Sequence, residues 1–494
     1  MVGRIRRMER SLSGWTLALT SVGFFMVALD ALVVITALPV IHRELGAGLA
    51  TLEWSVNAYL LVFAAGIISA AALGDRFGRR RVYVAGLLLF TVASAACAMA
   101  PTASWLIAAR AIQGLGAAVV TPLSLTILTT GFSPERRGSI VGIWGGIAGL
   151  AIAAGPLVGG AVTQGMSWHW IFWVNVPIGL AAALLSLVRL DESRGPRTGL
   201  DLAGVTLASG AAGTLVWALV HANEVGWSNP QIVIALGLGL VSVVGFVAWE
   251  GHASAPMVPL RLFRIRAFAA ANVTIVFMTA AIFSAAFLMS QFFQLALGYD
   301  ALATGVRFLP WTATPLIVAP IAGAVSDKVG TLPFMAAGLT LQAAGLGWIA
   351  VVAATNVGYG PLLLPLMVAG IGISMALPTT PVAGLSAVEP PEVGKASGVL
   401  NTLQRFGGAL GVAVVSAVFT ANGNLSTSES LYAGFRPALW VAAAFSLLGA
   451  ASALAVTPRR AAKKGKLQDS STSSPVAITR PSSHRDSTLP SENC

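Results

Sequence analysis

The chain has 494 residues, of which 56% are hydrophobic and only 10% are charged. Soluble globular domains contain roughly 25% charged residues, so a chain this apolar is not soluble as a whole. Its formal charge of +11 does not indicate nucleic acid binding, because the basic residues gather in the polar segments between apolar stretches. Two cysteines, Cys97 and Cys494, give neither a disulfide framework nor the spacing of a metal site.

Apolar stretches of about 20 residues recur along the chain, each long enough to cross a hydrocarbon core of roughly 30 Å as a helix. They lack the alternation of barrel strands, and lipid allows only helices or closed barrels. The first stretch is too long for a signal peptide, so we expect it to stay attached. The predicted spans are 14–40, 54–74, 82–100, 104–131, 138–162, 169–190, 201–221, 231–250, 268–296, 304–325, 331–353, 361–384, 397–420 and 434–456. We therefore expect an all-α integral membrane protein with about fourteen transmembrane helices.

The basic residues sort to alternate ends of these spans. If the N-terminus is cytoplasmic, that side receives most arginines and lysines, among them the run at 79–81. The opposite side receives Arg43, Arg307 and Arg436. This positive-inside pattern predicts a multi-pass protein of the cytoplasmic membrane, with both termini in the cytoplasm and the chain embedded in the lipid bilayer. The Gly-, Ala- and Arg-rich composition suggests a bacterial source.

An internal repeat relates the two halves of the chain. The segment GLG at 114–116 recurs as GIG at 370–372, and GDRFG at 74–78 recurs as SDKVG at 326–330. Secondary transporters contain such repeats, with the binding site between them near the bilayer midplane. The repeat predicts pseudo-symmetric halves arranged as 6 + 2 + 6 helices. The expected parts are a cytoplasmic N-terminus (1–13), a six-helix bundle (14–190), a linker with two inserted helices (191–267), a second bundle (268–456) and a disordered cytoplasmic tail (457–494).

Three ionisable residues lie deep within the predicted spans: Asp30, the only acid we place there, Arg110 and Arg405. A charge at the bilayer centre costs roughly 2.5–3.5 kcal/mol on insertion scales, so such residues face a cavity or a partner. Asp30 could form a structural pair with Arg110, or it could load and release a proton from a cavity that opens alternately to each side. The matching second-half positions hold Ile282 and Leu366. We therefore expect the first half to handle a proton and both halves to enclose the cargo.

Two glycine-rich segments stand out beside these charges. The loop GDRFGRRR at 74–81 joins the second and third spans, where glycines permit a tight turn and Asp75 can pair with an arginine. It could be merely a topogenic basic loop, but its recurrence at 326–330 favours a specific role. The segment GPLVGG at 155–160 combines a helix-kinking proline with glycines that allow close helix packing.

Together these segments resemble the major facilitator superfamily, and specifically its fourteen-helix drug:proton antiporter branch. The resemblance covers about residues 14–456. It rests on LDALVVITALP (29–39), GDRFGRRR (74–81), RAIQGLGAA (110–118), AAGPLVGG (153–160), SWHWIFWVNVPIG (167–179), ATGVRFLPW (303–311) and LNTLQRFGGALGVA (400–413). The resemblance implies proton coupling by Asp30 and Arg110. It implies a cytoplasmic conformational latch at Asp75, Gly78 and Arg79, and an antiporter hinge at Gly155, Pro156, Gly159 and Gly160.

The sequence departs from this family pattern at several positions. Ala71 and Ala151 stand where glycines are usual, and His169 replaces an arginine between two tryptophans. Gln404 precedes Arg405, the reverse of the expected order, which rotates the arginine by about 100° on a helix. The fold expectation is unaffected, but the role of Arg405 is left open. We interpret His169 as an interfacial residue rather than a proton relay.

These features predict an exporter that exchanges entering protons for an amphipathic antibiotic or other toxic compound. Candidates for lining the cargo cavity are Met26, Gln113, Trp144, Gln291, Gln294, Trp311, Asn401 and Arg405. A proton-coupled importer of a small metabolite on the same fold is the alternative. No ATP-binding loop appears and the five histidines are scattered, so we expect neither an ATP-driven pump nor an enzyme. We expect a monomer with no metal or cofactor, driven by the proton gradient.

Overall fold

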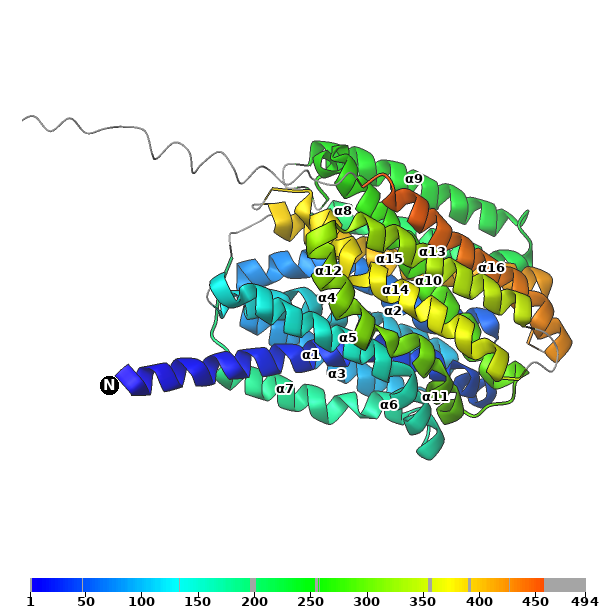
Figure 1. Ribbon diagram of the computed structural model, residues 1–494, viewed down its shortest axis with the longest axis horizontal. Helices are drawn as coiled ribbons and strands as arrows, with labels where there is room; N and C mark the ends of the chain where they lie inside the picture. Colours follow the sequence, from blue (N-terminus) through cyan, green and yellow to red (C-terminus); the bar gives the residue numbers. More distant parts are fainter. Residues whose placement is uncertain are drawn as a thin grey trace, which may run out of the picture. The chain divides into compact units, whose positions relative to one another are not determined.

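The computed structural model describes residues 2–456 except 47, 133, 196–200, 254–255, 257, 354–357, 390–391 and 426. The side chains of residues 2–13, 49–50, 52, 68, 134–143, 145, 148–149, 152–153, 223–224 and 327 are also outside the description. Residues Met1–Thr457 form one compact unit, and the described part of it contains helices but no strands. This confirms the all-α class (Figure 1). The predicted tail, 457–494, lies outside the described residues.

Consecutive helices follow one another with short connections. They are α1 (Val2–Leu45), α2 (Leu49–Phe77), α3 (Arg79–Ala98), α4 (Ala103–Thr130), α5 (Pro134–Gly165), α6 (Trp170–Trp173), α7 (Asn175–Arg189), α8 (Leu202–Val225), α9 (Pro230–His252), α10 (Arg266–Gln291), α11 (Ala301–Thr312), α12 (Thr314–Val329), α13 (Leu332–Val352), α14 (Gly360–Ser386), α15 (Val393–Asn422) and α16 (Ser428–Ala453). A short 3₁₀ helix, η1 (Leu260–Arg264), precedes α10, and a π-helical turn, η2 (Phe292–Ala296), follows it.

Twelve of the helical segments in the described residues are long and apolar enough to cross a membrane, or thirteen if the two parts of α2, bent by 49°, count as one span. Each of the predicted spans overlaps one helix or two consecutive ones, and α8 and α9 occupy the predicted insert. Several side chains of α5 are outside the description. The membrane protein is therefore confirmed, while the count of fourteen stays a prediction.

Local sequence signals explain where several helices begin and end. The hydroxyl of Thr102 accepts a hydrogen bond from the backbone N–H of Trp105 at the start of α4, and the carboxylate of Asp300 caps α11 in the same way. Gly78 separates α2 from α3 with φ of +108°, a conformation that favours glycine. These caps and the glycine turn fix the helix ends from which the polar residues project.

Close helix packing brings the first-half residues together. In that half α4 packs against both α2 and α3, and α3 packs against α7. A side chain at Gly114 would meet the backbone of Tyr59, and one at Gly116 would meet the backbone of Phe90. The halves meet where α5 packs on α11 and α2 on α15; the first pair can be followed in Figure 1. α4 therefore lies close enough to α2 and α3 for their side chains to share one polar network.

Candidate functional site

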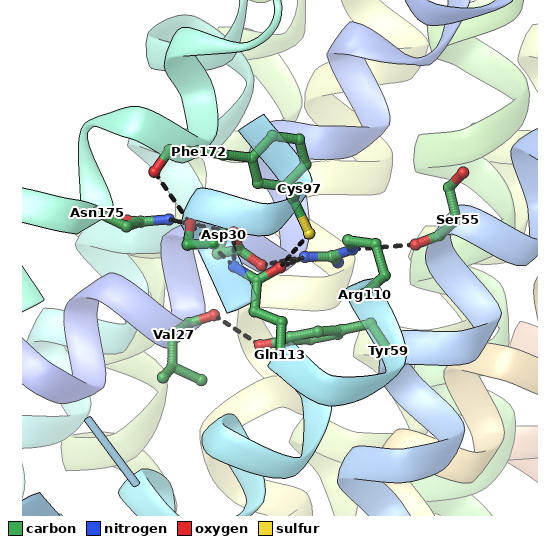
Figure 2. A network of polar contacts seen from close by, with 10 residues as sticks. Val27, Asp30, Ser55, Tyr59, Cys97, Arg110, Gln113, Phe172 and Asn175 are labelled. Atoms are coloured by element: carbon green, nitrogen blue, oxygen red, sulfur yellow. Dashed lines mark hydrogen bonds and ion pairs between the residues drawn. The ribbon is translucent and has the colours of Figure 1, made fainter. Parts of the chain in front are cut away.

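A buried polar network surrounds Asp30 in the first half (Figure 2). The guanidinium Nη1 of Arg110 lies 2.5 Å from Oδ2 of Asp30. The amide of Gln113 donates to Oδ1 at 2.9 Å, and the amide of Asn175 donates to the same oxygen at 3.3 Å. All four side chains are at most 4% exposed. The carboxylate thus receives donors from α4 and α7, and the predicted contact between Asp30 and Arg110 is present.

The arginine of this pair is held by several further groups. Its Nε donates to the backbone carbonyl of Ser55 at 3.1 Å, and its Nη1 donates to Oε1 of Gln113 at 2.7 Å. The guanidinium also lies over the ring of Tyr59, 4.1 Å from the centroid. The Tyr59 hydroxyl in turn donates to the carbonyl of Val27 on α1 at 3.2 Å. Arg110 therefore keeps neutral partners that do not depend on the charge of Asp30.

Helix α3 supplies a second layer around the network. Oγ of Ser94 accepts from the amides of Asn175 at 3.1 Å and Gln113 at 3.3 Å, and it donates to the carbonyl of Phe172 at 3.0 Å. Sequence reasoning had not assigned Ser94, Tyr59 or Asn175 to the site. For Asn175 a signal existed, because an amide in the apolar segment WVNVPIG needs a buried partner.

Two acids near helix ends, Glu53 in α2 and Glu250 in α9, are buried although sequence reasoning did not single them out. The second span was predicted to begin at residue 54, but α2 begins at Leu49 and therefore includes Glu53. Glu53 is only 2% exposed, and the hydroxyl of Ser416 on α15 donates a hydrogen bond to it. Asp30 remains the only acid deep within a predicted span, and Glu53 fell outside its span because the boundary was placed too late.

The three predicted latch residues lie together at the turn between α2 and α3. Nη2 of Arg79 lies 2.8 Å from Oδ1 of Asp75, and Gly78 forms the turn between them. The same turn binds the segment that follows α7. The N–H of Arg79 donates to the carbonyl of Ser193 at 2.9 Å, and that of Arg80 donates to the Glu192 carboxylate at 3.0 Å. The turn is therefore docked onto residues 192–195.

The predicted hinge glycines are contact points for α5. A side chain at Gly155 would meet Leu32, and one at Gly159 would meet the carbonyl of Val33, both on α1. A side chain at Gly160 would meet the backbone of Ala301 on α11. The carbonyl of Pro156 lies against Gly305 on α11 in the same manner. α5 thus packs closely against α1 of its own half and against α11 of the second half.

Hydrogen bonds join the halves at the end of the bundle where α1 ends and α2 begins. The hydroxyl of Ser290 donates to the carbonyl of Ile35 at 2.9 Å, and the amide of Gln294 donates to the carbonyl of Thr36 at 2.7 Å. The backbone N–H of Leu302 donates to the Gln164 side chain at 3.2 Å. The hydrogen bond between Ser416 and Glu53 lies at the same end. The structure is therefore closed at this end.

The remaining cavity candidates have varied surroundings. Met26, Gln291 and Trp311 are buried, and neither the amide atoms of Gln291 nor the indole N–H of Trp311 has a hydrogen-bond partner in the described structure. Trp144 stacks on Phe24 with centroids 3.8 Å apart. Asn401 donates to the carbonyl of its own helix at Ser397, 2.8 Å away. Among the interactions of the described residues, Gln113 is the predicted candidate that enters the Asp30 network, and Gln294 is the one that hydrogen-bonds across the halves.

His169, interpreted as an interfacial residue, and Arg405, a cavity candidate of open role, both stack on aromatic rings. The imidazole of His169 stacks on Trp168 with centroids 3.8 Å apart, and the Trp168 indole donates to the Glu44 carboxylate at 2.7 Å. His169 has no contact with the Asp30 network among the interactions of the described residues. The guanidinium of Arg405 lies over the ring of Phe63 on α2, 4.4 Å from the centroid.

Comparisons with known proteins agree with this architecture. The family model "Major Facilitator Superfamily" matches residues 20–412 and 311–485. The cephamycin export protein CmcT of Amycolatopsis lactamdurans is 33% identical over 450 residues, 90% of this chain and 92% of that protein. The tetracenomycin C resistance and export protein of Streptomyces glaucescens is 33% identical over 408 residues, 82% of this chain and 76% of that protein.

Solved structures share the fold. A crystal structure of the peptide transporter POT in complex with sulfate superposes with a TM-score of 0.64 at 18% identity, covering 90% of this chain and 96% of that one. A crystal structure of a mutant of the nucleoside transporter NupG gives a TM-score of 0.60 at 14% identity, covering 90% of this chain and 99% of that one. The chain belongs to the major facilitator superfamily, as the sequence motifs indicated.

Proposed function

We propose that this protein is a proton-coupled antiporter that exports amphipathic antibiotics or other toxic compounds across the bacterial cytoplasmic membrane. The carrying observation is the Asp30 network, a buried carboxylate whose partners come from several helices of one half. Names of relatives that describe antibiotic export or resistance support the choice of cargo class. The proposal includes a monomer with both termini in the cytoplasm and no cofactor beyond the proton gradient.

Proton binding to Asp30 would change the hydrogen bonds that join α1 to α4 and α7. An ionised carboxylate only accepts hydrogen bonds, whereas a protonated one must donate through one oxygen. The side chains of Arg110, Gln113 and Asn175 all donate to Asp30. A proton on Oδ1 competes with the amides of Gln113 and Asn175 for that oxygen, and a proton on either oxygen removes the charge that holds Arg110, so the packing of α1 against α4 or α7 changes.

The arginine can tolerate that change without becoming an isolated charge. When Asp30 is neutral, Arg110 still contacts the Ser55 carbonyl, Oε1 of Gln113 and the face of Tyr59. A buried charge with no partner would instead be strongly destabilising. Loading and release of the proton at Asp30 can thus proceed while the rest of the network stays formed.

Helix α1 connects this proton site to the contact between halves. Beyond Asp30, the carbonyls of Ile35 and Thr36 accept hydrogen bonds from Ser290 and Gln294 of the second half. A shift of α1 against α4 therefore changes the geometry at the closed end. In the proposal, proton and cargo bias the protein toward states open to opposite sides, which is a population shift.

The glycine-rich segments would serve this exchange. Asp75, Gly78 and Arg79 would latch the cytoplasmic side through the turn that binds residues 192–195. Gly155, Pro156, Gly159 and Gly160 would form the seal on which α5 pivots against α1 and α11. One proton entering down 100 mV releases about 2.3 kcal/mol, enough for a cargo gradient of roughly 50-fold.

Inverted membrane vesicles with an imposed proton gradient test this proposal. Proton release from the vesicles is followed as antibiotics and lipophilic dyes are added, for wild type, Asp30→Asn and the control Asp191→Asn, whose carboxylate is exposed. We expect discharge by wild type and the control but not by Asp30→Asn. Equal discharge by all three would place the proton site elsewhere. The importer alternative would be favoured if discharge of the gradient required a metabolite inside the vesicles, the side that corresponds to the outside of the cell.

A further inference from the structure

Arg405 on α15 is a charged side chain within a membrane helix, and it has no acidic partner among the described residues. Its Nε is buried without a hydrogen-bond partner, and none of the ion pairs of the described residues involves its guanidinium. Its guanidinium lies over the ring of Phe63, 4.4 Å from the centroid, and among the described residues it faces no carboxylate within ion-pair distance. Ionisable residues inside membranes usually pair with one another or mark a substrate pathway, so this arginine needs an explanation.

The position of Arg405 is the seam between the two halves. Phe63 belongs to α2 of the first half, and a side chain at Gly408, one turn beyond Arg405, would lie 3.4 Å from Leu60 of α2. Arg405 is partly exposed, although α15 packs against α2 along this seam. An anionic lipid headgroup is a poor partner, because Arg405 lies twelve residues, or about 18 Å, from the start of α15.

The acid of the proton site cannot serve as the missing partner. Both oxygens of Asp30 already accept hydrogen bonds, from Arg110 and from the amides of Gln113 and Asn175. Tyr59 and Phe63 separate the two arginines on α2. Arg110 lies over Tyr59, Arg405 lies over Phe63, and the two rings contact edge to face with centroids 5.7 Å apart. The guanidinium groups of Arg110 and Arg405 thus lie over two rings that contact each other. In the described structure only Arg110 is paired with a carboxylate.

We propose that Arg405 binds the anionic group of an amphipathic cargo, a carboxylate, sulfonate or phenolate, while Phe63 contacts its apolar part. A guanidinium presents a planar fork of donors that matches such groups and stacks on aromatic faces. The inference rests on the proposed export function and narrows its cargo class to compounds with an acidic group. It also places the cargo one aromatic pair away from the proton site.

A matched pair of dyes tests this assignment without a proton gradient. Purified full-length protein in uncharged detergent is dialysed against 8-anilino-1-naphthalenesulfonate or its uncharged parent, N-phenyl-1-naphthylamine, with protein-free micelles as the blank. We expect wild type to prefer the sulfonate. Arg405→Gln should lose roughly 10- to 100-fold in affinity for the sulfonate only, the effect of one charged hydrogen-bonding partner. Arg405→Lys should keep part of the preference.

The control Arg307→Gln removes a cation that lies over Tyr299 instead, and it should bind both dyes as wild type does. Loss of both dyes in Arg405→Gln, with an unchanged gel-filtration profile, would overturn the proposal in favour of a packing role. Equal or absent binding of the two dyes by wild type would overturn it as well. Because no gradient is used, these outcomes are independent of whether Asp30 couples transport to protons.

Discussion

Asp30 and Arg110 in the first half neutralise each other within a shell of amides and hydroxyls, whereas Arg405 in the second half lies over an aromatic ring and meets no carboxylate in the described structure. The glutamines differ in the same way. Both ends of the Gln113 amide are hydrogen-bonded, but in the described structure both ends of the buried Gln342 amide lack a partner. The first half thus holds a completed network around Asp30, although its buried Asn57 also lacks amide partners in the described structure, and Arg405 in the second half belongs to no such network.

The difference indicates a division of labour between the halves. The donors of the completed network are already used within it, so they are not free to bind a cargo. In the proposal, the change that this network undergoes is protonation of Asp30. A buried polar atom without a partner costs roughly 1–3 kcal/mol, and Arg405, at the seam between the halves, has such a donor available to a cargo. On this account the first half carries the proton, and polar groups of the second half contribute to holding the cargo.

The largest effect is expected on stability, when a substitution removes a member of the completed network. Arg110→Gln leaves Asp30 buried without a counter-charge, and losing one partner of a buried pair costs about 3–5 kcal/mol. We expect a clearly lowered unfolding temperature for the purified protein in detergent.

The double variant Asp30→Asn/Arg110→Gln provides the control for that prediction. Removing both charges should restore most of the stability lost in Arg110→Gln, since no unpaired carboxylate remains. A double variant no more stable than Arg110→Gln would show that the arginine stabilises the bundle by packing, and the contrast between the halves would lose its electrostatic basis.

A medium effect is expected where the halves touch. Gly160→Ala places a methyl group against the backbone of Ala301 and forces α5 away from α11. Overpacking of this kind costs about 1–3 kcal/mol, so the closed end should open more often and transport should fall roughly tenfold. Accessibility of an introduced Leu302→Cys to a membrane-impermeant thiol reagent should rise.

Gly165 on the same helix offers a matched control, because a side chain there would meet nothing within 4 Å. Gly165→Ala should leave both transport and labelling unchanged. If the two alanine variants behaved alike, the backbone contact at Gly160 would not be what seals this end.

The smallest effect concerns the turn at 74–81. Asp75→Asn removes the ion pair with Arg79. Both side chains of this pair are partly exposed, and exposed ion pairs contribute about 0.2–1 kcal/mol to stability. We expect the transport rate to change by up to roughly fivefold with dye binding unaltered. Asp191→Asn, at an exposed acid next to the docked segment, should leave the rate at the wild-type value. Rates that do not separate these two variants would argue against a latch.

The sequence was sufficient for the helices and for the central ion pair, because long apolar runs and rare intramembrane charges are strong local signals. Asn175, Ser94 and Tyr59 were not found, since their role depends on how α2, α3 and α7 pack around Asp30. Glu53 was missed because apolar patterning locates helix ends only to within a few residues. The contact of Arg405 with Phe63 joins residues 342 positions apart, which no local pattern encodes.

The central claim is that Asp30 is the group whose charge changes when cargo binds. Purified protein in weakly buffered detergent solution, mixed with a compound that discharges the vesicle gradient, reports this directly through a pH-indicating dye. The account predicts proton release on cargo binding from wild type and none from Asp30→Asn, with cargo binding retained in both. Equal proton release from wild type and Asp30→Asn would contradict it.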